Sequence, residues 1–277
     1  MRRNNEDRLM GGHKPTPSED APQMANPMDF VTPSEFVELP SKGRYPEGHP
    51  LCGHDSIEIR YMTAKDEDLL TNRSLLKKGL AIDRLLRNLI KDPTIDARSL
   101  YSGDRNSIII HARVSAYGSE YRTAVTCPAC GETNKFKFDL GDYEEYDGNG
   151  IEGTNIQNNN DGTFSTILPL SKIVARIKPL NGHDELSMAT PDNAKETSKA
   201  AVTRQIRRFV VDFNGYEDVN TIAHVVDNMV AVDSKYLRNC FSLISPDIKM
   251  EQKFVCKNCE HEEVMVVPFG TDFFWPE

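Results

Sequence analysis

The sequence predicts an α+β protein in which a four-cysteine zinc ribbon is assembled from two distant hairpins. Two Cys-x-x-Cys motifs, Cys127–Cys130 and Cys256–Cys259, each lie between runs of strand-like residues. Patterns of helical spacing precede the first motif and fill much of the interval between the two, which indicates a largely helical insertion. Residues 1–28 are rich in proline and poor in apolar side chains, so we expect an extended N-terminal arm there.

The paired motifs predict one structural zinc ion. A two-residue spacing lets one tight turn present two thiolates to a metal, and two facing turns complete a tetrahedral site. Strand-like runs flank both motifs, at 121–126, 135–138, 253–255 and 264–267. Four thiolates leave no position for an activated water, so this zinc is expected to stabilise the fold. The predicted ligands are Cys127, Cys130, Cys256 and Cys259.

Other interpretations of the cysteines fit their setting less well. Two disulfides require an oxidising compartment, and we expect none because the first residues lack the pattern of a signal peptide. A thioredoxin-type motif requires a βαβ setting, and neither pair opens a helix. His261 is a possible competing ligand, although the thiolate set is already complete. His49 and His54 flank Cys52 as a weaker candidate metal site, and Cys240 is expected to be a small buried hydrophobe in a helix.

The first half of the chain is predicted to mix strands and helices. Thr63 and Asp66 have the spacing of a capping box that opens a short helix ending at Leu70. Ser74 is expected to cap a longer helix that Asp92–Pro93 stops. The predicted strands span 36–39 and 56–62, and the predicted longer helices span 75–90 and 104–116.

The second half begins with an acidic segment, Asp142–Asp161, that is rich in glycine and asparagine and is expected to be a solvated loop. A calcium loop is the alternative, although the oxygens lack the regular alternation of an EF-hand. Asn181 is predicted to begin a helix that contains His183–Glu185. Strands are predicted at 164–168 and 173–178, and helices at 194–212, 220–230 and 234–244.

Five regions follow from these elements. They are the N-terminal arm 1–28, an α+β N-terminal region 29–118, the ribbon with an aromatic C-terminal tail at 119–140 and 248–277, the acidic loop 141–162, and a mainly helical insertion 163–247.

The sequence offers no arrangement typical of an active site. Walker A, G-x-G-x-x-G, G-x-S-x-G and H-E-x-x-H motifs are absent, and Lys42–Gly43 lacks the downstream pattern of a phosphate loop. A formal net charge of −9 disfavours nucleic-acid binding. No apolar run approaches the roughly 18 residues of a membrane span. We therefore expect no catalytic residues, no small-molecule substrate, no direct nucleic-acid partner and no membrane insertion.

Two segments are candidate partner contacts. The aromatic residues Phe273, Phe274 and Trp275 either fold back into a groove of the core or dock on another protein, since aromatic anchors are enriched at interfaces. The loop 41–50, rich in glycine and proline, either connects two strands or contacts a partner through Arg44 and Tyr45.

Several segments resemble the baseplate protein family of T4-like contractile-tailed bacteriophages. They are Leu39–Pro50, Ile57–Leu69, Leu75–Gly79, Ile82–Leu85, Gly103–Asn106 and the knuckle Cys127–Gly131. The second half resembles the family through its closing Cys-x-x-Cys motif and aromatic tail. The resemblance implies a baseplate hub subunit or hub assembly factor, whose partners are other baseplate and tail proteins. It also implies assembly in the bacterial host cytoplasm and a place in the virion.

The expected function is therefore a non-enzymatic, zinc-stabilised structural component of the baseplate hub. One alternative is a hub assembly factor that is absent from the mature virion. A second is a zinc-ribbon regulator of phage transcription, which the net charge disfavours. A third is an enzyme of the acidic loop that would need a divalent metal and Asp142 or Asp147.

Overall fold

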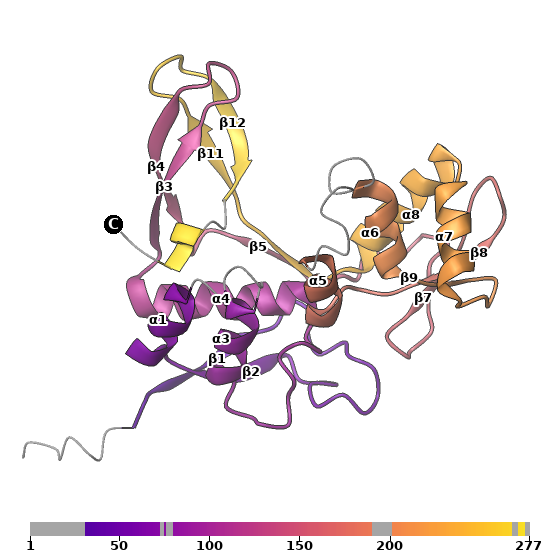
Figure 1. Cartoon of the computed structure of the whole chain (residues 1–277), viewed down its shortest axis with the longest axis horizontal. Helices are drawn as coiled ribbons and strands as arrows, with labels where there is room; N and C mark the ends of the chain where they lie inside the picture. Colours follow the sequence, from indigo (N-terminus) through magenta and orange to yellow (C-terminus); the bar gives the residue numbers. More distant parts are fainter. Residues whose placement is uncertain (1–30, 73–74, 76–79, 190–200, 268–270, 275–277) are drawn as a thin grey trace, which may run out of the picture. The chain divides into compact units, whose positions relative to one another are not determined.

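The computed structural model describes residues 31–72, 75, 80–189, 201–267 and 271–274. The chain divides into two units, Met1–Thr32 and Pro33–Glu277, and the second contains the elements described below. The predicted N-terminal arm, residues 1–28, lies outside the described residues. The described chain mixes helices and strands, as the sequence predicts (Figure 1).

The helices vary from one short turn to about four turns. They are α1 (Ala64–Thr71), α3 (Ala81–Leu89), α4 (Ser102–Tyr117), α5 (Gly182–Ala189), α6 (Ala201–Phe209), α7 (Val219–Asp227), α8 (Ala231–Ile244) and the 3₁₀ helix η2 (Thr271–Phe274). Among the described residues, no helix has the length and apolar character that crossing a membrane requires.

In the part of the chain that the structure describes, the strands form four two-stranded sheets and one four-stranded sheet. The two-stranded sheets are β1 (Ser34–Glu38) with β2 (Ser56–Arg60), β3 (Glu120–Thr126) with β4 (Thr133–Asp139), β5 (Glu144–Tyr146) with β10 (Asp247–Lys249), and β11 (Glu251–Val255) with β12 (Glu262–Val266). The larger sheet has the order β6 (Gln157–Asn158), β7 (Phe164–Ile167), β8 (Val174–Ile177) and β9 (Val210–Phe213). All pairings are antiparallel.

The predicted capping box at α1 is confirmed. The Asp66 carboxylate accepts a hydrogen bond from the Thr63 N–H at 2.8 Å, and it also binds the Thr63 hydroxyl and the Arg60 guanidinium. The next helix is shorter than predicted, because α3 begins after Leu80 and ends before Ile90, which forms a β-bridge to Ile59. Ser74, its expected cap, lies outside the described residues.

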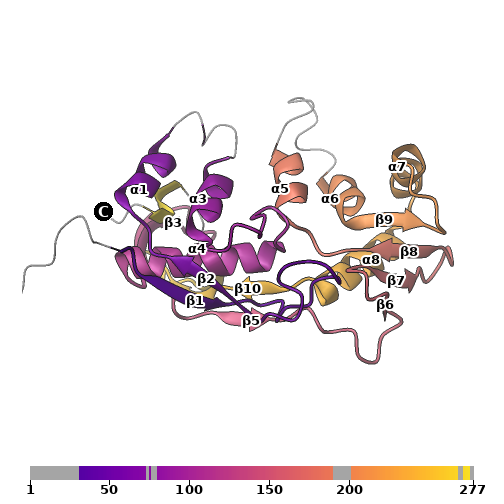
Figure 2. The same ribbon diagram turned by 90° about the horizontal axis from the view of Figure 1, so that it is seen from below.

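Helix α4 contributes to the first of the two hydrophobic cores that the described residues form. Figure 2 shows β1 and β2 running alongside it, and the Ser107 hydroxyl donates to the Glu38 carbonyl at 2.9 Å. Gly103 lets α4 lie directly against the backbone at Pro246, because a Cβ at this position would lie 2.3 Å from the Pro246 carbonyl oxygen. The core contains side chains from β1 to β4, from α3 and α4, and from β10, β11 and η2.

The acidic segment is more ordered than the predicted loop. Glu144–Tyr146 pairs as β5 with β10, about one hundred residues further along the chain, and Gln157–Asn158 pairs as β6 with β7. Two of its carboxylates form ion pairs with the loop 41–50. Glu145 pairs with Lys42 and Asp147 pairs with Arg44, each at 3.1 Å. Backbone pairing and ion pairs together explain why this polar stretch is held against the protein.

The segment 163–247 contains a sheet as well as helices. Strands β7, β8 and β9 pack with α6, α7 and α8 around a second hydrophobic core. The prediction of one helix over 194–212 is wrong at its end, because Val210–Phe213 forms β9 and pairs with β8. Two consecutive valines favour this extended backbone, and the ladder supplies the hydrogen bonds that a helix would otherwise make. Residues 190–200 lie outside the described part of the chain.

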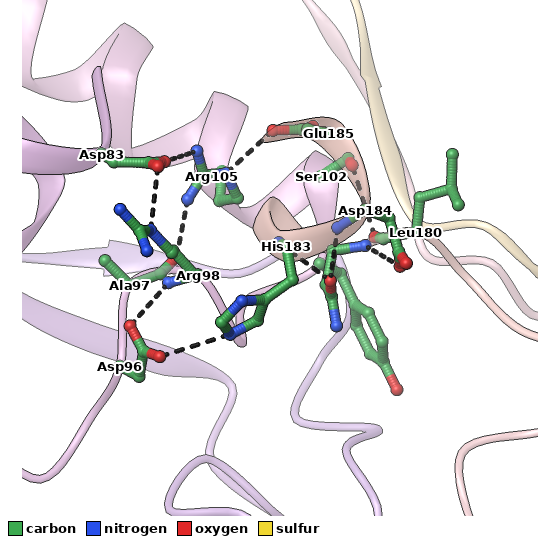
Figure 3. Close-up of polar contacts among 12 residues, drawn as sticks. Asp83, Asp96, Ala97, Arg98, Ser102, Arg105, Leu180, His183, Asp184 and Glu185 are labelled. Carbon is green, nitrogen blue, oxygen red and sulfur yellow. Dashed lines mark hydrogen bonds and ion pairs between the residues drawn. The ribbon is translucent and has the colours of Figure 1, made fainter. Parts of the chain in front are cut away.

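A buried polar network joins the segment after α3 to the start of α5 (Figure 3). Arg105 of α4 donates to the Asp83 carboxylate at 2.6 Å, to the Ala97 carbonyl at 2.7 Å and to Glu185 at 3.1 Å. The N–H groups of His183 and Asp184 donate to the Asn181 side chain, which confirms the predicted helix start. The residues His183–Glu185 therefore contribute hydrogen bonds to the start of α5 and to this network.

Candidate metal centre

The two Cys-x-x-Cys turns have the same backbone geometry. In each, the N–H of the first cysteine donates to the carbonyl five residues on, Cys127 to Glu132 at 2.8 Å and Cys256 to His261 at 2.9 Å. The carbonyl of the first cysteine accepts from the N–H four residues on, at 2.9 and 3.0 Å. These bonds fold each turn tightly enough to direct two sulfur atoms to one side.

The residue after each second cysteine has left-handed backbone. Gly131 has φ of 73° and Glu260 has φ of 56°. Glycine adopts this conformation without steric cost, whereas an L side chain costs roughly 1–2 kcal/mol there. The second turn therefore carries local strain that the first one avoids.

The four predicted ligands lie together at the ends of the two hairpins. Figure 1 shows the β3–β4 and β11–β12 hairpins with their turns at the same end. The sulfur atoms of Cys127 and Cys259 are 3.7 Å apart, as are those of Cys130 and Cys256, and all four lie within 4.8 Å of one another. These separations are far longer than a disulfide bond of about 2.05 Å. The cluster is compatible with a metal site, and among the described residues it is the group with that property.

Two asparagines support the sulfur cluster reciprocally, and the sequence patterns did not identify them. The Asn134 amide, from β4, lies 3.5 Å from the sulfur of Cys256 in the other turn. The Asn258 amide, in the second turn, lies 3.8 Å from the sulfur of Cys130 in the first. Amide donors directed at thiolates stabilise negative charge on sulfur. No sequence signal marks Asn134, because its register opposite the other hairpin is set only by folding.

Hydrogen bonding shifts the pKa values of the Cys256 and Cys259 thiols in opposite directions. Backbone N–H groups of Cys259 and Asn258 lower the pKa of Cys256 to about 6. The His261 N–H also lowers the pKa of Cys259, but hydrogen bonds with neighbouring thiols outweigh it and raise that pKa to about 12. A cluster that holds protons in this way must release them on binding a cation. His261 remains outside the sulfur cluster, with its ring 3.5 Å from the Glu263 carboxylate.

Aromatic side chains fill the space beneath the sulfur cluster. Phe136 of β4 lies edge-on to Phe254 of β11, with ring centroids 5.4 Å apart, and Tyr121 lies edge-on to Phe273 at the same distance. Edge-to-face contacts of this kind add to the energy of burial. The hairpins are therefore joined by an apolar layer as well as by the cysteines.

Two of the C-terminal aromatic residues, Phe273 and Phe274, are part of this core. Phe273 and Phe274 are buried, and the Phe273 carbonyl accepts a hydrogen bond of 2.7 Å from Nε of the buried Arg113. The prediction that these two side chains contact a partner is therefore corrected, because burial in the chain's own core makes them inaccessible. Trp275 lies outside the described residues.

The two candidate contacts in the loop 41–50 differ from each other. Tyr45 is buried, stacked between His49 and Tyr101, and its hydroxyl donates to Asp104 at 2.5 Å. This position corrects the prediction of a partner contact for Tyr45. Arg44 remains partly exposed while it pairs with Asp147, so its side chain is accessible to a partner.

The minor metal site suggested around Cys52 does not form. The His49 ring accepts the Leu51 N–H at Nδ1, at 3.2 Å, which leaves the proton on Nε2 to donate to the Ser99 hydroxyl at 2.8 Å. His49 is thereby occupied, and it cannot act as a base toward Ser99. Cys240 is buried as predicted, and burial raises its pKa.

Comparison with protein families gives one finding. A family model described as the T4 bacteriophage base plate protein matches residues 32–275. Searches of curated proteins and of solved structures give no match.

Proposed function

Because the chain belongs to the T4 bacteriophage base plate protein family, we propose that this baseplate component is a non-enzymatic structural subunit of the hub region, held together by one zinc ion. Family membership implies a place in the phage tail and contacts with other tail proteins. The hub position, the zinc and the absence of catalysis are the proposed parts.

The geometry of the sulfur cluster is the observation that supports zinc. A regular tetrahedron with zinc–sulfur bonds of about 2.3 Å has sulfur–sulfur edges of about 3.8 Å. Two edges of the cluster measure 3.7 Å, and no sulfur pair exceeds 4.8 Å. Four thiolates are a donor set typical of structural zinc, and they leave no open coordination position. Cys127, Cys130, Cys256 and Cys259 would hold the ion.

Such an ion would connect chain segments that are far apart in sequence. Residues 131–255 lie between the two turns, so the cluster closes a long loop. Restricting a loop of about one hundred residues in the unfolded chain contributes up to about 5 kcal/mol in the chain-entropy treatment of crosslinks. A structural subunit benefits from this, because both hairpins and the second core are then tied to one framework.

The hydrogen bonding of the interior supports a structural role. Among the described residues, each buried side-chain nitrogen or oxygen has a hydrogen-bond partner. The buried Asp104, whose pKa is raised by burial, is occupied by Ser41 and Tyr45 rather than directed at a substrate. These groups hold the loop 41–50 on α4.

Two measurements test the proposal. Zinc determination on the purified chain is expected to give one ion per chain, and a zinc-free, folded protein would contradict the metal assignment. Quantitative mass spectrometry of purified particles is expected to find a fixed small number of copies in each. Abundance in the infected-cell lysate with none in particles would instead identify a hub assembly factor.

A further inference from the structure

Strand β12 forms an open edge of the ribbon. Val267 donates to the Met250 carbonyl, and His261 accepts from the Cys256 N–H, so odd-numbered residues of this strand bond to β11. Strand alternation then directs the backbone groups of Glu262, Val264 and Val266 away from β11. Figure 1 shows no other labelled element along this side of the hairpin. In the described part of the chain, no hydrogen bond satisfies these outward groups.

The side chains along this edge include two exposed valines, which follow two exposed glutamates, Glu262 and Glu263. Val264 and Val266 are 63% and 64% exposed, and Val255 on the neighbouring strand is 41% exposed on the same face. Beside them, Lys253 and Glu262 form an ion pair of 2.5 Å. Isolated surface valines are common, but Val264 and Val266 are neighbours on one face of a strand whose edge is unpaired. The Lys253–Glu262 ion pair separates these two valines from Val255.

The corresponding edge of the other hairpin is protected. The Gln252 side chain binds both the N–H and the carbonyl of Asp139 at the base of β4, as a neighbouring strand would. Lys135 and Lys137 occupy the exposed face further along β4. Lysines and capped backbone groups are the usual means of blocking strand addition. Among the described residues, the β12 edge has neither a lysine nor a capped backbone group, and its charged side chains are Glu262 and Glu263.

We propose that β12 pairs antiparallel with β12 of a second copy of this chain, about a two-fold axis beside Val264. In that register Val264 lies opposite Val264 of the second copy, and Glu262 lies opposite Val266. The outward backbone groups of all three residues then find partners in both chains. The two hairpins become one four-stranded sheet whose outer face carries the valines of both copies.

The self-complementary register is the reason for choosing a second copy as the partner. An isologous interface requires that each residue meet a suitable counterpart from the same strand. Here no carboxylate faces another carboxylate across the new pair, since Glu262 meets valine and Glu263 meets Met265. Each Lys253–Glu262 ion pair remains on its own hairpin, next to Val264.

Proline substitution tests the pairing without breaking the hairpin. Val264→Pro removes an N–H that points away from β11, whereas Lys253→Pro removes an outward N–H from the opposite edge of the same hairpin. Sedimentation equilibrium of the full zinc-loaded chain is expected to show a dimer for the natural sequence and for Lys253→Pro. Val264→Pro is expected to weaken dimerisation about tenfold or more, because both copies lose a main-chain hydrogen bond. Zinc content serves as the control for folding.

Crosslinking tests the register. In a Cys52→Ser background, Val264→Cys is expected to form an intermolecular disulfide under mild oxidation, since opposed Cα atoms would lie about 5.5 Å apart. Val255→Cys places the same thiol on the same face, one strand away from the axis, and is expected not to crosslink. A monomeric natural chain at tens of micromolar, equal weakening by both prolines, or equal crosslinking of both cysteines would overturn the proposal.

Discussion

Arg113 provides the sharpest test of how the C-terminal tail is held. Its side chain is fully buried and has no carboxylate partner among the described residues. Instead it donates to the carbonyls of Phe273, Gly118 and Glu120 at 2.7, 2.9 and 3.3 Å. The guanidinium also lies 5.1 Å from the centre of the Tyr117 ring. Replacing it with methionine keeps an unbranched apolar stem while removing every donor.

The expected loss follows from these contacts. The Phe273 carbonyl is buried, so leaving it unpaired costs about 2 kcal/mol. The carbonyls of Gly118 and Glu120 are partly accessible to water, and their loss adds about 0.5 kcal/mol each. The contact with Tyr117 adds about 0.5 kcal/mol. We therefore expect Arg113→Met to lower the free energy of unfolding by about 3.5 kcal/mol, with Arg113→Lys in between.

Two measurements on this variant separate local from global effects. Urea denaturation followed by far-ultraviolet circular dichroism gives the change in stability, with Arg122→Met as the exposed control. That control is expected to change stability by less than about 0.5 kcal/mol. Hydrogen exchange should become faster in 271–274 before other parts of the core. A loss below about 1 kcal/mol, with exchange in the tail unchanged, would refute this account of Arg113.

Three further predictions concern pH, metal and backbone strain. Although burial opposes the shift, hydrogen bonds from Arg60 and Thr63 lower the pKa of Asp66 to about 2 from 3.8. The ionised carboxylate therefore adds about 2 kcal/mol to the free energy of unfolding above pH 4, and this contribution is lost as the pH falls toward 2. In acid titrations followed by circular dichroism, the stability difference between Asp66→Asn and the natural chain should shrink over that interval. Cys256→Ser is expected to lose zinc and misfold while Cys52→Ser keeps one zinc per chain, and full zinc content in Cys256→Ser would exclude the four-cysteine site. Glu260→Gly is expected to raise the thermal midpoint through a gain of about 1 kcal/mol, because it relieves the left-handed backbone; an unchanged or lower midpoint would mean that the turn is not strained.

The features that the sequence predicts correctly depend mostly on interactions between residues close together in the chain. The capping box of α1 needs only Thr63 and Asp66 three residues apart, and a Cys-x-x-Cys turn positions its two sulfurs through hydrogen bonds within six residues. The sequence also predicts that the two hairpins face each other, because each Cys-x-x-Cys turn supplies only two of the four ligands of a tetrahedral zinc site. The structure brings those sulfurs together as expected.

The errors arose where distant segments compete for the same residues. Val210–Phe213 continues a helical pattern in the sequence, yet it forms β9 because it pairs with β8. The acidic segment around Glu145 is ordered by strand pairing with β10 and by the ion pair with Lys42. Tyr45 was predicted to contact a partner, whereas its side chain is buried and its hydroxyl donates a hydrogen bond to Asp104.

The chain's family membership, its candidate metal ligands and most of its helices and strands were thus readable from residue types and spacing, because each depends on contacts within a few residues or on a recognisable motif. The tertiary structure alone decided the burial of Phe273 and Phe274, the reciprocal asparagine contacts and the open edge of β12. The physical reason is that burial and edge exposure depend on which segments pack together, and no local pattern in the sequence contains that information.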